Sequence, residues 1–294
     1  MTFSDIYPEN NLYGFSFNIN KFLDIKNRSN SLNSYVEHGL FLSSYVSRLS
    51  YEYNVKNIIT FSEFREKSLM NNVNIRNANI NIVKIGPYIS YCNSILNEVS
   101  KKEIKNKYGR ILLVFPSHSI EKVTIKFDNK RFVDEILNVK SEVKADSVFV
   151  CLYWKDIEVK EISNLYERHG FRIVCAGHKN DKYFLNRLRS IIEVSDFTMS
   201  NEVGTHVGYC IYLKKPHYIF SQHIDYEEGL LNVIKAEKID ENVLKSQEYH
   251  KRIIEMMFSK VQEISKEQED VTDYYWGLHS TRSKDELRQL LGIC

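Results

Sequence analysis

The stretch SDFTMSNEVGTH, residues 195–206, places polar side chains and a glycine directly after an expected strand. The chain has only 11 glycines in 294 residues, yet Gly204 and Gly208 flank this threonine and histidine. If a helix starts after Gly204, the N–H groups of its first turn and the helix dipole form a seat for an anion such as phosphate, and Thr205 adds a hydroxyl donor. The alternative is a tight turn in which Thr205 caps the helix and binds no ligand.

Two serines and a histidine follow an earlier expected strand. In FPSHS, Ser117, His118 and Ser119 come directly after ILLV, so their hydroxyl and imidazole donors can face a phosphate or a sugar. The alternative is a turn begun by Pro116, in which the serines bond only to the local backbone. The position favours ligand binding, because the crevice of an open α/β sheet lies at the carboxyl ends of its strands.

Two further strand ends carry candidate ligands. After FRIV, the turn AGHKND places Gly177 and His178 where they can face a base or ribose, while its Asn and Asp residues cap the next helix. After DFTM, Ser200 and Asn201 precede Glu202, whose carboxylate can accept hydrogen bonds from ribose or sugar hydroxyls. Capping of the following helix is the alternative role for this carboxylate.

Candidate proton acceptors lie in the first third of the chain. YVEHG contains Glu37 and His38, and TFSEF contains Glu63. A histidine within reach of a hydroxyl acts as a general base, and a neighbouring carboxylate can orient or replace it; a structural role for a lone histidine is the alternative. A rigid turn with an aromatic ring is expected at Gly86, Pro87 and Tyr88. This turn either lines a ligand-binding cleft or acts as a hinge that contacts no ligand.

An alternating series of expected strands and helices positions the candidate residues between Ser117 and Thr205. Apolar runs at 110–116, 147–154, 171–177, 196–200 and 216–220 alternate with amphipathic segments at 130–143, 159–170, 182–195 and 204–214. Continuous apolar strands between amphipathic helices predict a parallel sheet covered on both faces, which is a Rossmann-like unit. Helices at 243–264 and 284–292 form a C-terminal tail.

The first part of the chain is less regular. We expect irregular structure over 1–30, helices over 31–54 and 65–72, and strands over 55–64 and 80–91. The lysine-rich segment 101–110 is predicted to be a linker. The expected domains are therefore residues 1–105 and residues 106–294, and the second carries the ligand-binding sheet and the helical tail.

The composition of the chain is that of an ordinary globular protein. The chain is 43% hydrophobic, and 40 basic against 38 acidic residues give a formal charge of +2, which does not favour a nucleic-acid partner. Its five widely spaced cysteines are interpreted as buried thiols in a reducing compartment. Because no signal peptide or membrane-length apolar run is apparent, we expect a cytoplasmic protein.

Several enzyme classes are disfavoured by missing motifs. The sequence contains no G-x-G-x-x-G, no P-loop, no H-E-x-x-H and no D-x-D pair, so a dinucleotide oxidoreductase, a P-loop NTPase and a zinc peptidase are not indicated. We expect neither a metal nor another cofactor.

The passage from 111 to 220, with FPSHS, AGHKND and SNEVGTHVGYCIYLKKP, resembles the donor-binding domain of glycosyltransferases with the GT-B fold. It departs from that pattern in having Val203-Gly204 in place of a double glycine and in lacking the acidic residue within the helix. The resemblance implies two Rossmann-like domains facing a cleft, with Ser200, Glu202, Gly204 and Thr205 holding the phosphates or ribose of a nucleotide sugar. FPSHS is similar to motifs by which bacterial sialyltransferase-like and capsule-building enzymes bind CMP-sugars, which favours CMP over UDP.

That resemblance implies a metal-independent transferase of surface polysaccharide synthesis, such as capsule or lipopolysaccharide. The acceptor would be a glycan or lipid-linked sugar, and the enzyme would contact the inner membrane or other assembly enzymes peripherally. The alternatives are a nucleotide-sugar 2-epimerase-like enzyme and a non-catalytic sugar-nucleotide-binding or assembly protein.

Overall fold

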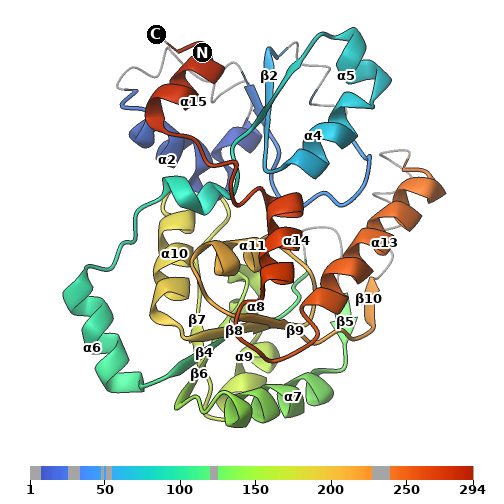
Figure 1. Cartoon of the computed structure of the whole chain (residues 1–294). Helices are drawn as coiled ribbons and strands as arrows, with labels where there is room; N and C mark the ends of the chain where they lie inside the picture. The colour runs from blue at the N-terminus through green and yellow to red at the C-terminus, as the bar shows by residue number, and fades with distance from the viewer. Residues whose placement is uncertain are drawn as a thin grey trace.

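The computed structural model of the chain describes residues 8–25, 34–47, 50, 55–119, 125–226 and 239–293. Within these ranges, two parallel sheets of three and five strands and an antiparallel pair of strands are present. Figure 1 shows the three-stranded sheet and its helices on one side of the molecule and the five-stranded sheet on the other. We call these the first and the second unit.

The second unit is built on a fully parallel sheet. Its strands are β4 (Ile111–Phe115), β6 (Ser147–Cys151), β7 (Arg172–Val174), β8 (Phe197–Ser200) and β9 (His217–Ile219), in the order β7-β6-β4-β8-β9. The chain builds the sheet outward from β4 in one direction and then returns to add β8 and β9 on the other side. The switch point, where an open α/β sheet leaves a crevice, therefore lies between β4 and β8.

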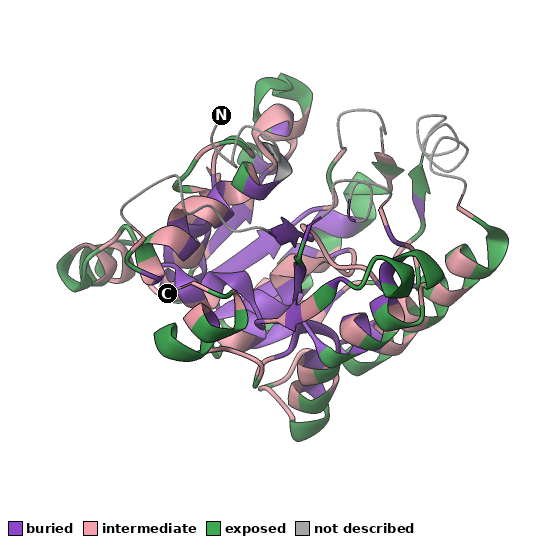
Figure 2. Cartoon of the chain, turned by 90° about the horizontal axis from the view of Figure 1, so that it is seen from above, coloured by how far each residue is buried: buried purple, intermediate pink, exposed green. Residues whose placement is uncertain are grey.

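Alternating residues of β4 explain why helices cover both faces of this sheet. Leu112 and Val114 pack against α7 (Asn129–Glu142) and α9 (Lys160–Glu167), whereas Leu113 and Phe115 pack against α10 (Phe184–Val194) and α11 (Thr205–Tyr212). Side chains alternate between faces along a strand, so a continuous apolar run is buried on both. In Figure 2, the buried central strands lie inside a shell of partly exposed helices.

The first unit is smaller. Its strands β1 (Ser34–Val36), β2 (Asn57–Thr60) and β3 (Asn81–Lys84) are parallel and lie in that order. Its helices are listed here in chain order: the 3-10 helix η1 (Pro8–Gly14), α2 (Phe15–Phe22), α4 (Glu63–Met70), α5 (Val73–Asn77) and the 3-10 helix η2 (Tyr88–Tyr91).

The C-terminal helices connect the two units. After α13 (Glu241–Met257), helix α14 (Lys266–Trp276) packs on both α11 and α4. The last helix, α15 (Lys284–Leu290), returns to the beginning of the chain, where Lys284 pairs with Asp24 and Arg288 donates to the carbonyl of Leu23. Figure 1 shows α15 beside α2. The predicted α/β class, with two Rossmann-like units and C-terminal helices, is confirmed.

Local predictions for the first part of the chain are partly wrong. Residues 8–22 are helical rather than irregular, because Phe15 and Ile19 bury one face of α2. Within the helix expected over 31–54, residues 34–36 instead form β1, which pairs with β2, and residues 37–47 have irregular backbone, whereas Ser50 is helical. Residues 31–33, 48–49 and 51–54 lie outside the described residues. Pairing with a distant strand outweighs the local pattern here.

The segment predicted to be a linker is a helix. α6 (Glu98–Tyr108) begins at Asn97, whose side chain accepts from the N–H of Ser100, and ends at Gly109. No residue of α6 is fully buried, so its lysine-rich composition reflects exposure to solvent. The short antiparallel strands β5 (Ile125–Phe127) and β10 (Ile224–Tyr226) were not expected from the sequence.

Candidate functional site

A cavity of about 430 Å³ lies between the two units. Residues of both line it, which matches the predicted cleft. The first unit supplies Tyr13, Phe15, His38, Gly39 and Tyr88. Polar and small residues of the second unit in the lining include Ser117, His118, Gly177, Glu202, Gly204, Thr205 and His206. Sequence-predicted candidates from distant parts of the chain therefore meet at one place.

The switch point of the second sheet opens into this cavity. Phe115 and Ser200 are paired at the carboxyl ends of β4 and β8, so the residues that follow them lie side by side. Asn201 accepts hydrogen bonds from the Ser117 N–H at 2.6 Å and from the Ser117 hydroxyl at 2.9 Å. Asn201 is buried and lies behind the cavity wall, where it fixes the position of the serine.

Three side chains surround the carboxylate of Glu202. The Ser117 hydroxyl lies 3.1 Å from Oε2, the Lys251 ammonium lies 2.9 Å from Oε1, and the Tyr226 hydroxyl also donates to Oε1. The carboxylate lines the cavity in this fixed orientation. Lys251 and Tyr226 come from α13 and β10, which pattern analysis did not connect to the site.

The N-terminus of α11 faces the cavity without a side-chain cap. Gly204 is the N-cap residue, and no side chain among the described residues accepts a hydrogen bond from this end of the helix. The turn in which Thr205 caps the helix is therefore not what forms. The N–H of Val207 donates to the carbonyl of Gly204 at 3.1 Å, which leaves the N–H groups of Thr205 and His206 at the cavity lining. The partial positive charge of the helix end favours an anion there.

His206 is a site residue that the sequence predictions missed. Its ring stacks on Phe115 with centroids 4.7 Å apart, and its Nε2 atom is buried without a hydrogen-bond partner among the described residues. Burial, with His118 nearby, lowers the pKa of His206 to about 3, so the imidazole is neutral. A Cβ on Gly204 would lie 2.8 Å from this ring, so the close approach of the ring requires glycine.

His118 and Ser119, although adjacent in the chain, have different surroundings. His118 lines the cavity mouth, where its ring stacks on Tyr153 with centroids 4.4 Å apart. The Ser119 hydroxyl accepts from the N–H of Ile125 at 3.1 Å, and its residue lies outside the cavity lining. Ser119 therefore anchors the backbone at β5, the role that the turn interpretation gave to the serines.

Gly177 and His178 are also separated by the structure. Gly177 lines the cavity with a φ of +99°, and a Cβ there would lie 2.3 Å from the guanidinium of Arg187. His178 is exposed outside the lining, packs on Trp154 with centroids 4.3 Å apart, and accepts from the N–H of Asn180 through Nδ1. It stabilises the turn rather than facing the cavity.

Ser200 bonds to other parts of the protein and has a structural role. Its buried hydroxyl donates to the carbonyl of Glu202 at 2.7 Å and lies 3.1 Å from Nε2 of His217. Nδ1 of the same imidazole lies 2.7 Å from the Thr198 hydroxyl. Ser200 thus shapes the loop that carries Glu202 and does not line the cavity.

The first-unit candidates have three different surroundings. His38 lines the cavity, with its ring centroid 5.9 Å from that of Tyr13 and 6.1 Å from that of Phe15. Glu37 is buried in an ion pair with Arg65 at 2.5 Å, and Glu63 is exposed at the start of α4 in an ion pair with Lys67. Neither carboxylate lines the cavity, which leaves His38 as the candidate base.

Of the three residues in the predicted turn at 86–88, one lines the cavity and two do not. Tyr88 lines the cavity with its ring. Gly86 and Pro87 lie behind it, and Gly86, with a φ of +74°, packs so closely on the C-terminal segment that a Cβ would lie 2.6 Å from the carbonyl oxygen of Gly277. Gly86 thus joins the turn to the segment after α14.

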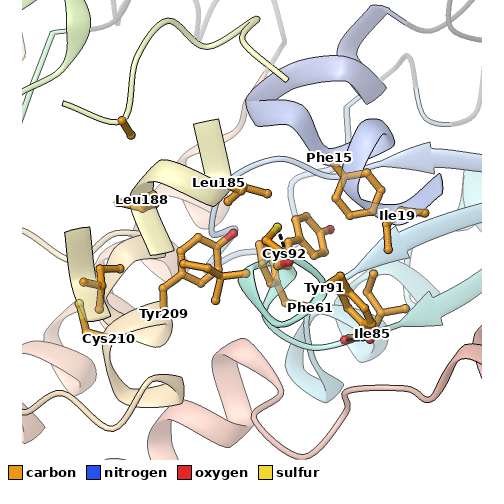
Figure 3. Close-up of a cluster of buried hydrophobic side chains, with 14 of the residues drawn as sticks. Phe15, Ile19, Phe61, Ile85, Tyr91, Cys92, Leu185, Leu188, Tyr209 and Cys210 are labelled. Atoms are coloured by element: carbon orange, nitrogen blue, oxygen red, sulfur yellow. Dashed lines mark hydrogen bonds between the residues drawn. The ribbon is translucent and has the colours of Figure 1, made fainter. Parts of the chain in front are cut away.

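Most of the remaining lining is aromatic or aliphatic. Figure 3 shows part of this cluster, in which Leu185, Leu188 and Tyr209 of the second unit lie with Phe15 of the first. Their apolar character was visible in the sequence, but only packing identifies which apolar residues border an open space.

In the described part of the chain, no group of three or more His, Cys, Asp or Glu side chains is placed to hold a metal ion. None of the helices in these ranges is long and apolar enough to cross a membrane. The four described cysteines are free thiols, and Cys92 and Cys210 are buried.

No protein-family model and no curated protein matches the chain. Similar solved structures include the wall teichoic acid polymerase TagF, with a TM-score of 0.44 and 10% identity over 83% of this chain and 59% of that chain. A TagF variant soaked with CDPG has a TM-score of 0.39 and 12% identity over 81% and 57% of the two chains. Phytolacca americana UGT2, complexed with UDP-2fluoro-glucose and pterostilbene, has a TM-score of 0.34 and 11% identity over 83% and 56%. The chain spans less than two thirds of each of these proteins, and at these TM-scores the likenesses carry no weight in assigning a function.

Proposed function

We propose that this protein is a glycosyltransferase that moves a sugar from a nucleotide-activated donor to a hydroxyl group of an acceptor. One observation carries the proposal: the uncapped N-terminus of α11 opens at the switch point into a cavity that His38 lines from the other unit. An anion seat and a candidate base thus lie in the same cavity on different units.

The donor's phosphates would bind at the N-terminus of α11. Backbone N–H groups there and the hydroxyl of Thr205 are hydrogen-bond donors. The oriented carboxylate of Glu202 would accept from ribose or sugar hydroxyls. Negative charge that develops on the leaving nucleotide would be stabilised by the helix N-terminus, so no metal ion is required for this step.

His38 would act as the base. It takes the proton of the acceptor hydroxyl as that oxygen forms a bond to the anomeric carbon of the sugar. The bond from the anomeric carbon to the phosphate oxygen breaks, and its electron pair leaves with the nucleotide. Glu37 cannot share this role, because both of its oxygens are occupied by Arg65 and Thr60 within the first unit.

The finer assignment rests on the sequence resemblance. We propose a CMP- or UDP-sugar donor, hexosyl or sialyl, and a role for the enzyme in surface polysaccharide synthesis. A cytoplasmic location belongs to the same proposal and is supported by the free cysteines of the described chain.

Differential scanning fluorimetry with CMP, UDP, GDP and ADP in the presence of EDTA tests the proposal. A nucleotide that binds only the folded protein raises the Tm by mass action, so we expect one of the pyrimidine nucleotides to give the largest shift. His118→Ala, at the cavity mouth, should reduce that shift, while His169→Ala, on an exposed histidine outside the lining, serves as the control. The absence of a shift with all four nucleotides at millimolar concentration would reject the proposal.

A further inference from the structure

The part of the cavity around the candidate base is apolar. The rings of Tyr13 and Phe15 are the neighbours of His38, at centroid distances of 5.9 and 6.1 Å. Phe184 packs edge-on against Tyr13 at 4.9 Å, and Tyr88 lies 4.6 Å from Phe15. All five residues line the cavity, so a hydroxyl within reach of His38 lies among aromatic rings.

The hydroxyl of Tyr88 does not change this character. It donates to the carbonyl of Glu37 at 2.8 Å and lies 3.3 Å from the carbonyl of Ile59. Both acceptors belong to the backbone of the first sheet, so the ring rather than the hydroxyl remains for a bound molecule. Further along α10, Leu185 and Leu188 extend the same apolar lining.

Apart from His38 itself and the hydroxyls of Tyr13 and Tyr88, the polar side chains of the cavity belong to the second unit. Ser117, Glu202 and Thr205 follow β4 and β8 of the second unit, which is where the donor is proposed to bind. A glycan acceptor that reached His38 would bury several hydroxyls against rings and leucine side chains. Each hydroxyl left without a hydrogen-bond partner weakens binding by roughly tenfold, whereas an apolar group gains from leaving water.

We propose that the acceptor is an alcohol whose hydroxyl is attached to an apolar group, aryl or isoprenoid, and not to a polyhydroxylated sugar. The inference rests on the proposed function, because it takes His38 as the base. The apolar group would occupy the space between Tyr13, Phe15 and Phe184, and the hydroxyl would face the imidazole.

Isothermal titration calorimetry with three alcohols tests this inference. 2-Naphthol represents an aryl alcohol, geraniol an isoprenoid alcohol, and methyl glucoside a sugar acceptor. We expect at least one of the two apolar alcohols to bind with a Kd at least tenfold lower than that of methyl glucoside. The alcohol that binds more tightly shows whether the apolar group of the acceptor is aryl or isoprenoid. Equal binding of all three, or no binding of either apolar alcohol, overturns the inference.

Matched variants locate the binding site. Phe184→Ser removes one wall of the cavity and should weaken the apolar alcohol at least fivefold. Phe17→Ser changes another partly buried aromatic residue, which packs on Tyr183 outside the cavity, and should stay within twofold of the wild type. Tyr13→Asn is a second wall variant that suits the left-handed backbone at this position, with φ of 57°. Unchanged binding in both wall variants overturns the inference.

Nucleotide thermal shifts measured on the same samples separate the two proposals. Apolar alcohol binding without any nucleotide shift supports the chemistry of the cavity and rejects the donor assignment. A nucleotide shift together with preferential glucoside binding keeps the glycosyltransferase proposal and rejects the apolar acceptor.

Discussion

Glu37 and His38 are neighbours in the chain with opposite surroundings. The Glu37 carboxylate points into the first unit, where Arg65 binds it through Nε and Nη2 and Thr60 donates to Oε2. The same guanidinium donates to the carbonyls of Ser43 and Tyr45. This buried network fixes the backbone just before His38, so the pair divides into a structural carboxylate and a residue that lines the cavity.

The variants Glu37→Gln and Glu63→Gln should therefore differ in stability. Breaking the buried pair leaves the Arg65 charge without a full partner, at a cost of about 3 kcal/mol in the free energy of unfolding. Glu63→Gln removes an exposed pair with Lys67 and should leave this free energy unchanged. Urea unfolding of both variants measures the difference, and equal midpoints would show that the buried network does not hold this segment.

His38→Ala tests the candidate base. General-base catalysis contributes about 10²–10⁴-fold, so transfer to the acceptor should fall by that factor while the nucleotide-induced Tm shift is retained. His279→Ala, an exposed histidine beside Asp273, is the control. If His38→Ala retains full transfer activity, another group is the base; if the wild type binds nucleotide but has no transfer activity with any acceptor, the non-catalytic alternative is favoured.

Two buried histidines give the protein a defined pH dependence. Burial lowers the pKa of His206 to about 3 and that of His217 well below its ordinary value of 6.5. Below pH 6.5 the unfolded chain binds protons that the folded chain excludes, so the free energy of unfolding falls as the pH falls, by at most about 1.4 kcal/mol per pH unit for each histidine. We expect lower urea midpoints at pH 5 than at pH 7 and a shallower decline in His206→Asn. Identical slopes in the two proteins would contradict the neutral state of His206.

At the scale of the elements, α11 is positioned by close packing against α14. A Cβ on Gly208, in the middle of α11, would lie 2.1 Å from Cδ1 of the fully buried Trp276. The glycine therefore lets the indole rest on the helix backbone, and this contact fixes the helix whose N-terminus forms the proposed anion seat.

Gly208→Ala should accordingly destabilise the protein, although alanine ordinarily favours a helix by about 0.5–1 kcal/mol. Overpacking against Trp276 is expected to cost about 1–3 kcal/mol. In the double variant with Trp276→Leu the alanine should cost less, because the smaller side chain leaves room for it. Costs that simply add in the double variant would show that the indole does not cause the effect.

The elements also show what the sequence could predict. The second sheet was predictable, because ILLVF and SVFVC are continuous apolar runs and each is followed by an amphipathic helix. β1 was not, since its three residues gain their structure from pairing with β2. For the site, strand ends located Ser117, Glu202 and Gly204, but the role of His206 depends on a stacking partner in β4, and the apolar wall depends on how η1 meets α10. Such contacts arise only when distant segments pack.

At the scale of the whole molecule, the two units share one core. The largest hydrophobic cluster includes Phe15 and Ile59 from the first unit and Leu185 and Tyr209 from the second. Polar contacts also cross the junction between the two units, where Arg189 of α10 donates to the carbonyls of Ile89 and Cys92. The cavity is therefore formed between parts that are joined by a continuous interior.

This junction contains a buried amide pair that leads to the last prediction. The side chains of Asn18 and Asn186 donate to each other at 3.0 and 2.9 Å, and each uses its second donor on a backbone carbonyl, that of Gly14 or Asn93. Asn18→Ala leaves the Asn186 amide without its partner, at a cost of about 1–3 kcal/mol. Because the core is shared, this loss should lower hydrogen-exchange protection equally in β2 of the first unit and β4 of the second. Loss of protection in β2 alone would show that the units unfold separately, and that the cavity between them opens at a lower free energy than global unfolding.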